Sequence, residues 1–240
     1  MKRTHTVGIL AGLFFLSAFL STGYTKCKNS EKGPGIGYFE IGAVSVDLSN
    51  LNAVLHTSGY PKLSPRFFSY GGGGLSFVDR FVIGGEGIGF FKSSVTGNGN
   101  KLSLSGGYGV FEMGYRLFKT RKTSLYPLFG IGGGGLNLRV TEQNLSSNFS
   151  ELLKHPAGNV QFSSGEFLMD LGLGGCWLLG SKEKKGRVGG FLVGFRVGYL
   201  VAPFRQNWKL QDVSVLDAPK TSFSGPYFMI AIGAGSQKMK

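Results

Sequence analysis

The sequence predicts an all-β fold, an eight-stranded antiparallel up-and-down transmembrane β-barrel. Eight segments rich in glycine and aromatic residues alternate between apolar and polar positions, as strands with two different faces do. The linkers between them run long, short, long, short, which is typical of a barrel whose turns lie at one end and whose loops lie at the other. Glycine is heavily used, with 41 residues and no collagen period, while abundant aromatic residues argue against disorder.

The predicted strands share this alternation and occupy residues 36–48, 66–78, 80–92, 102–118, 124–139, 162–180, 188–203 and 223–236. Brief linkers surround Asp79, Arg121 and Lys184, and longer ones surround Leu55, Gly97, Leu152 and Lys209. This rhythm orients the barrel, because the short turns and both termini then lie at the periplasmic end.

The N-terminal segment predicts a secretory signal peptide. Lys2 and Arg3 precede an apolar run, Val7–Leu20, that is too short to cross a bilayer as a helix, and small residues follow it up to Gly23. We therefore expect residues 1–23 to be a signal peptide and 24–35 a periplasmic tail. The barrel then takes residues 36–236, and residues 237–240 form a basic tail. Because no later segment is long and apolar enough for a membrane helix, any spanning must be done by strands.

Charged residues occupy one face of the predicted strands. In 162–180 and 188–203 the bulky apolar residues share one phase, while Asp170 and Arg196 lie in the other. Lipid outside and a polar lumen inside would explain this division. The predicted lumen charges are Glu40, Arg80, Glu86, Glu112, Arg116, Glu166, Asp170 and Arg196. An interior of eight strands is just wide enough for side chains to fill, so these charges form either a salt-bridge plug or the lining of a narrow polar path.

Outward-phase aromatic residues gather near the strand ends, as expected of two girdles at the membrane interfaces. The first girdle, at the short turns, is predicted to contain Phe39, Phe81, Tyr115, Trp177 and Phe191. The second girdle, at the long loops, is predicted to contain Phe68, Tyr70, Phe91, Phe167 and Tyr199.

The formal net charge of the whole chain is +13. An exporting leader argues against nucleic acid as the partner of these cations. They concentrate in the short linkers, at residues 119–122 and 182–187, and at the C-terminus. There they either face anionic lipid headgroups or are simply solvated turn residues.

The two cysteines, Cys27 and Cys176, allow one disulfide, which export permits. Both are predicted near the periplasmic rim, so a bridge that ties the N-terminal tail to the barrel is one interpretation. Two free thiols, or a buried apolar Cys176, are the alternatives. A lipoprotein anchor at Cys27 is disfavoured, because Tyr24-Thr25-Lys26 stands where a lipobox would place leucine and small residues.

Other motifs indicate neither catalysis nor a cofactor. Gly130–Gly135 contains a formal G-x-G-x-x-G, but a strand follows it where a dinucleotide site needs a helix. His56 and His155 lie in predicted loops with no serine placed beside them, and no His/Cys spacing suggests a metal site. The loops Leu48–Leu63 and Leu145–Val160 mix apolar and polar residues. They are the expected functional surface or, alternatively, self-packed caps over the mouth.

The leader, the eight strands, the short inner turns and the charged lumen resemble the small outer-membrane barrels, the class of outer-membrane proteins A, X and W. That resemblance implies the outer membrane of a Gram-negative cell, with outer-membrane lipids, lipopolysaccharide and the barrel-assembly machinery as partners. One departure is the polar end Gly235–Lys240, where such proteins usually finish on an aromatic residue. We expect a structural or surface-interaction role. Binding or narrow transport of a small or hydrophobic ligand through the barrel mouth is the alternative, and lipid-modifying enzymology is a third.

Overall fold

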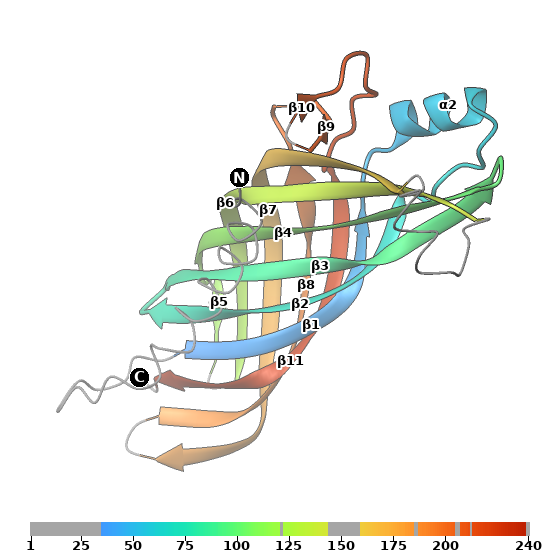
Figure 1. Ribbon diagram of the computed structural model, residues 1–240. Helices are drawn as coiled ribbons and strands as arrows, with labels where there is room; N and C mark the ends of the chain where they lie inside the picture. Colours follow the sequence, from blue (N-terminus) through green and yellow to red (C-terminus); the bar gives the residue numbers. More distant parts are fainter. Residues whose placement is uncertain are drawn as a thin grey trace, which may run out of the picture. The chain divides into compact units, whose positions relative to one another are not determined.

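The computed structural model describes residues 35–120, 122–143, 159–184, 187–204, 207–211 and 213–238. Eight long antiparallel strands form a closed ring in this part of the chain (Figure 1). They are β1 (Gly35–Ser45), β2 (Arg66–Val78), β3 (Phe81–Gly97), β4 (Asn100–Tyr115), β6 (Thr123–Glu142), β7 (Asn159–Lys184), β8 (Arg187–Val201) and β11 (Gly225–Lys238). The ring closes because β1 pairs with β2 on one side and with β11 on the other. The predicted fold is confirmed.

Four short elements complete the described chain: α2 (Ser49–Thr57), β5 (Phe118–Lys119), β9 (Lys209–Leu210) and β10 (Val213–Ser214). No described helix has the length and apolar character needed to cross a membrane. The turn between β2 and β3, the connection of β4 to β6 and the junction of β7 with β8 lie at one end of the ring, together with the start of β1. We call this the turn end, and the opposite end the mouth.

The linker around Gly97 is not a long loop, so that prediction was wrong. Strands β3 and β4 continue past the predicted ends and meet in a two-residue turn at Asn98 and Gly99, with φ of 48° and 71°. Positive φ at both central residues matches the twist of a hairpin. A bulge also interrupts the alternation, because Phe90 pairs with Gly106 while Ser93 pairs with Leu104. Because the phase changes at this bulge, period-two alternation does not predict the end of β3, residues 93–97.

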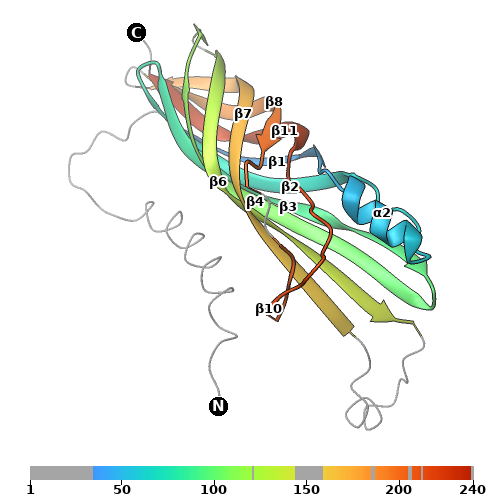
Figure 2. The same cartoon turned by 90° about the horizontal axis from the view of Figure 1, so that it is seen from above.

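The mouth is covered by two segments that are far apart in the sequence. In Figures 1 and 2, α2 and the β9–β10 segment both lie at this end of the barrel. Backbone hydrogen bonds join Asp47 and Ser222 in both directions, at 2.9 and 3.2 Å, and the Asn50 side chain donates to the Lys220 carbonyl at 3.1 Å. The helix buries Leu51 and Leu55 against the interior. These two segments therefore form a packed cap over the mouth.

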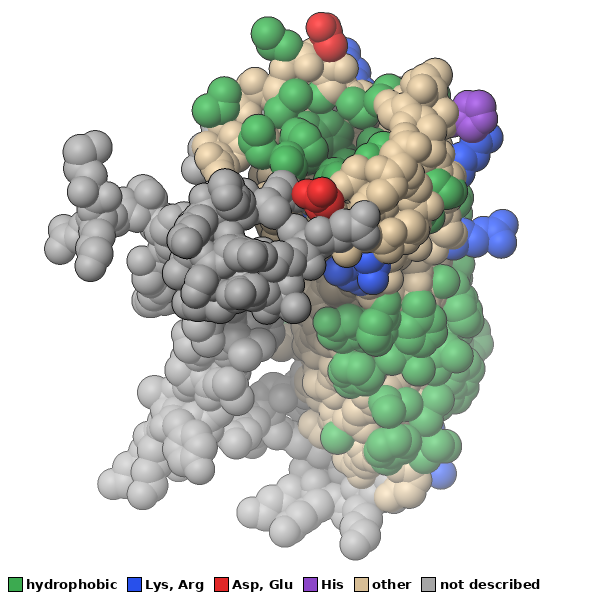
Figure 3. Space-filling view, turned by 45° about the vertical axis from the view of Figure 1, so that its right-hand side comes forward, with side chains coloured by type: hydrophobic (Ala, Val, Ile, Leu, Met, Phe, Trp, Pro, Cys, Tyr) green, Lys and Arg blue, Asp and Glu red, His purple; other side chains and the backbone are tan. Residues whose placement is uncertain are grey.

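The outer wall of the ring is apolar. All ten predicted girdle aromatics are exposed, which confirms that they point outward. Between them lie further exposed apolar side chains, among them Ile41, Ile83, Phe111, Ile131, Leu171, Val197, Phe228 and Ile230. Figure 3 shows such side chains gathered in a belt on one face of the barrel. A belt of this extent is unstable in water but matches the hydrocarbon of a bilayer, so we treat this ring as membrane-spanning.

Candidate functional site: the charged layer of the lumen

Five strands bring charged side chains to the same level inside the ring. They are Glu40 on β1, Glu86 on β3, Glu112 on β4, Asp170 on β7 and Arg196 on β8, and each is buried. We call these five residues the charged layer. Each has a glycine as its partner on at least one neighbouring strand: Gly71 faces Glu40, Gly73 faces Glu86, Gly130 faces Glu112 and Asp170, and Gly174 faces Arg196. These small neighbours leave the interior free for long side chains.

The Arg196 guanidinium is the centre of the layer. Its Nη1 forms an ion pair with Glu86 Oε2, and its Nη2 forms one with Glu112 Oε1. Nη2 also lies 3.3 Å from Asp170 Oδ2, and Nη1 lies 3.9 Å from Glu40 Oε1. One cation therefore connects carboxylates from four other strands.

The layer contains more carboxylates than cations. Both oxygens of Glu40, one of Glu112 (Oε2) and one of Asp170 (Oδ1) are buried without a hydrogen-bond partner in the described structure. A buried charge is costly unless it is paired, so a fully ionised layer would be strongly unfavourable. Four carboxyl groups therefore share one guanidinium in this layer.

Glu86, Glu112 and Asp170 each offer an oxygen within 4.8 Å of the others, a spacing that a metal ion could use. The Arg196 guanidinium already contacts all three carboxylates. The positive charge that a metal ion would bring to these oxygens is thus already supplied by Arg196.

The other predicted lumen charges lie outside this layer. Arg80 is in the turn after β2 with an exposed side chain, so it is not a lumen residue. Arg116 is buried at the turn end, where its guanidinium donates to the Asp79 carbonyl and lies 4.5 Å from the centre of the Phe77 ring. Glu166 lies toward the mouth and accepts a 2.9 Å hydrogen bond from the Phe223 amide.

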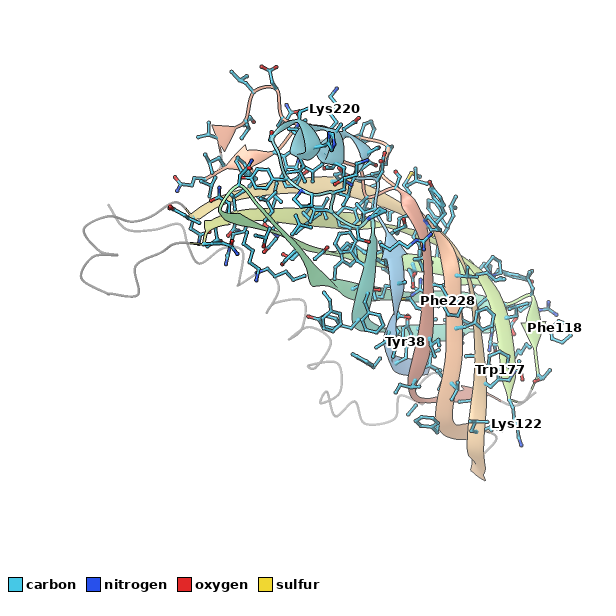
Figure 4. The ribbon with its side chains drawn as sticks, turned by 90° about the vertical axis from the view of Figure 1, so that its right-hand side faces the viewer. Tyr38, Phe118, Lys122, Trp177, Lys220 and Phe228 are labelled. Atoms are coloured by element: carbon cyan, nitrogen blue, oxygen red, sulfur yellow. The ribbon has the colours of Figure 1, made fainter. Side chains whose placement is uncertain are left out.

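Two tyrosines that the sequence analysis did not predict contact the charged layer. The Tyr227 hydroxyl donates to Asp170 Oδ2 at 3.1 Å, and Arg196 Nη1 lies 3.3 Å from the Tyr38 hydroxyl (Tyr38 is labelled in Figure 4). Their inward phase was a usable signal, since Tyr38 stands two residues before Glu40 in the same strand.

Apolar side chains fill the lumen on both sides of the charged layer. The lower cluster, toward the turn end, contains Ile36, Leu75, Phe77, Val82, Leu128, Leu178 and Leu192 among others. The upper cluster, toward the mouth, includes Phe67, Phe90, Tyr108, Leu136, Leu168, Trp208 and Phe223. The expectation of a polar lumen is therefore corrected. Five of its charges form one layer between two apolar ones, while Arg116 and Glu166 are buried nearer the two ends.

The cysteine and histidine predictions fall partly outside the described residues. Cys176 is a free thiol buried in the lower cluster, and Cys27 lies in the part of the chain that is not described. His56 is exposed on α2, and no hydrogen bond joins its side chain to a described hydroxyl or carboxylate. His155 and nearly all of the loop Leu145–Val160 also lie outside the described ranges.

Comparison with known proteins finds likeness in structure. The outer membrane protein OprG from Pseudomonas aeruginosa is 13% identical, with a TM-score of 0.34 over 84% of this chain and 94% of that chain. The outer membrane protein AlkL, solved by solid-state NMR in DMPC bilayers, is 13% identical, with a TM-score of 0.35 over 90% and 95%. No protein-family model and no curated sequence matches. The closed strand pairing, rather than these distant likenesses, establishes the fold.

Proposed function

We propose that this chain is an outer-membrane β-barrel of a Gram-negative cell envelope, closed to water, with a structural or surface-interaction role. One observation supports this most strongly. The charged layer and the apolar clusters above and below it fill the lumen, while the outer wall carries an apolar belt. A filled interior of eight strands leaves the outer surface and the mouth for function.

The hairpin of β3 and β4, which extends beyond the mouth, offers a surface for interaction. Beyond the belt, the outward positions of β3, β4 and β6 are polar, as at Thr96, Lys101, Asn137 and Arg139. Because these strands continue past the level of the second girdle, they would project from the membrane as a rigid sheet. Binding residues on such scaffolds are common at barrel mouths.

The membrane location is tested with the whole protein from envelope fractions. We expect extraction by detergent alone, and a gel mobility that changes on boiling because the closed barrel resists unfolding by detergent. A protein that is freely soluble after removal of the leader would contradict the proposal and would indicate a secreted barrel instead.

A second function, binding of a small apolar ligand beneath the mouth, is favoured by the position of Phe223. Its ring is fully buried and lies 5.4 Å from Phe90 and 6.5 Å from Tyr108. Phe223 belongs to the loop between β8 and β11, so movement of that loop would open an aromatic-lined compartment.

Tryptophan fluorescence tests this second function, because the chain has two tryptophans. Trp177 faces lipid, whereas Trp208 is buried beneath the last loop and donates to the Pro219 carbonyl at 2.9 Å. In Trp177→Phe protein, titration with a short-chain alkane should shift Trp208 emission in a saturable way. An emission spectrum that stays constant up to the solubility limit would remove this function.

A further inference from the structure

An aromatic patch lies on the outer wall where β2 and β3 leave the apolar belt. Its members, Phe68, Tyr70 and Phe91, are all exposed. The rings of Phe68 and Phe91 are 5.4 Å apart, and those of Tyr70 and Phe91 are 4.7 Å apart. The three rings thus form one continuous outward surface.

Two cations border this patch on the side of the mouth. Arg66 is exposed and shares its strand phase with Phe68 and Tyr70, so it stands above them on the outer wall. Lys92 follows Phe91 directly, and both are exposed because the β3 bulge places two residues opposite one. Without the bulge, Lys92 would point into the apolar upper cluster.

These cations stand at the boundary between apolar and polar wall. Below them the outward residues of β3 are Phe81 and Ile83, and above them are Ser94 and Thr96. On the face drawn in Figure 3, Lys and Arg side chains lie between the apolar belt and the mouth. In a membrane this boundary is the level of the lipid headgroups.

Within the described residues, neither cation is neutralised by a carboxylate. The structure shows no ion pair from Arg66 or Lys92 to any carboxylate that it describes. A guanidinium fork binds phosphate oxygens bidentately, and an ammonium adds a point charge. Aromatic rings at the same interface favour the first carbons of acyl chains.

We propose that Arg66 and Lys92 bind the phosphate of an outer-leaflet lipid whose acyl chains lie on Phe68, Tyr70 and Phe91. The site rests on the proposed membrane location, but it adds a specific place and a specific headgroup chemistry. It is distinct from the lumen, because all five side chains face outward.

The test is native mass spectrometry of the whole protein in neutral detergent micelles, titrated with a bis-phosphorylated lipid A and with the same lipid after removal of both phosphates. The test variant is Arg66→Gln with Lys92→Gln. The matched control, Arg80→Gln with Lys122→Gln, removes the same charge at the turn end, where Figure 4 places Lys122.

We expect the test variant to weaken binding of the phosphorylated lipid about 30-fold, the effect of two cations near an anionic surface. The control variant should bind like the wild type, and the dephosphorylated lipid should bind all three proteins equally weakly. Equal binding by the test variant and the wild type, or an equal loss in the control, would overturn the site. Heat-modifiable mobility of each variant reports the barrel separately, so a failed fold is distinguished from a failed site.

Discussion

Arg196 connects the strands from inside the barrel. Its guanidinium contacts Glu86, Glu112 and Asp170, with Glu40 at 3.9 Å. Arginine suits this position because its donors point in several fixed directions and it stays charged. A buried residue with this many partners is expected to dominate the energetics of the lumen.

Replacing Arg196 by Met should destabilise the folded barrel by about 3–5 kcal/mol, because the buried carboxylates then lose their cation. Urea titration in detergent, followed by folded and unfolded gel mobility, measures this. The loss of stability in Arg196→Met should be smaller at lower pH, because protonation removes the unpaired negative charge of the carboxylates. Arg80→Met, at an exposed turn position, should stay within about 0.5 kcal/mol of the wild type. Equal stability of the two variants would show that the layer contributes little.

Replacing a carboxylate of the charged layer by its neutral amide should change the stability of the barrel differently at Asp170 and at Glu40. Asp170 accepts from Tyr227 and Arg196, so Asp170→Asn should cost about 1–3 kcal/mol. Glu40 has no hydrogen bond to a described group at either oxygen, so Glu40→Gln removes excess charge and should leave stability equal or higher. The same urea titration measures both. A larger loss for Glu40→Gln than for Asp170→Asn would contradict the proposed excess of carboxylates.

At the scale of elements, the glycines of β6 allow the barrel to close tightly. A Cβ added at Gly132 would lie 2.0 Å from the Gly109 carbonyl oxygen on β4, so the backbone would have to move. At Gly87 an added Cβ meets nothing within 4 Å. The two positions therefore form a matched pair, because an added Cβ is crowded at Gly132 and unhindered at Gly87.

Gly132→Ala should destabilise the barrel by about 1–3 kcal/mol or prevent its refolding in detergent, as overpacking does. Gly87→Ala should be neutral or slightly stabilising, because it restricts the unfolded chain. Refolding yield and urea midpoint decide between them. Identical behaviour of the two variants would mean that the Gly132 contact is relieved at no cost.

The sequence predicted all eight strands because alternation is a local property that is strong in β7 and β8. It failed between Ser93 and Lys101, because the bulge at Phe91 and Lys92 shifts the phase just before that segment. The dipeptide Asn98-Gly99 is a strong hairpin signal and could have corrected the error. Extending the phase of β3 by one residue places Arg80 in the lumen, but Arg80 lies in the turn between β2 and β3, where the phase no longer applies.

At the scale of the whole molecule, the lumen is built as three layers. The inward phase of β8 shows this in sequence order, because Leu192, Arg196 and Leu200 belong to the lower cluster, the charged layer and the upper cluster. The apolar members of this phase were available in the sequence. Charges alone do not define the inner face, because apolar residues in the same phase also line it.

The contacts within the layer could not be predicted, since they depend on the stagger of strands around the ring. Glu40 and Arg196 are separated by β11, and their meeting across the lumen follows from closure rather than from any local signal. The cap over the mouth is likewise a contact between distant segments. Hydrogen bonds from residues 47–50 to residues 220–222 form only once the ring is closed.

Single-channel conductance in planar lipid bilayers tests the closed lumen most directly. The whole wild-type protein, shown to be folded by its heat-modifiable mobility, should insert without producing discrete current steps. Cys176, in the lower cluster, should also stay unreactive toward a hydrophilic maleimide in Cys27→Ser protein. Reproducible conductance steps of constant size from the wild type would contradict the account, because a water-filled path would then cross the charged layer and both apolar clusters.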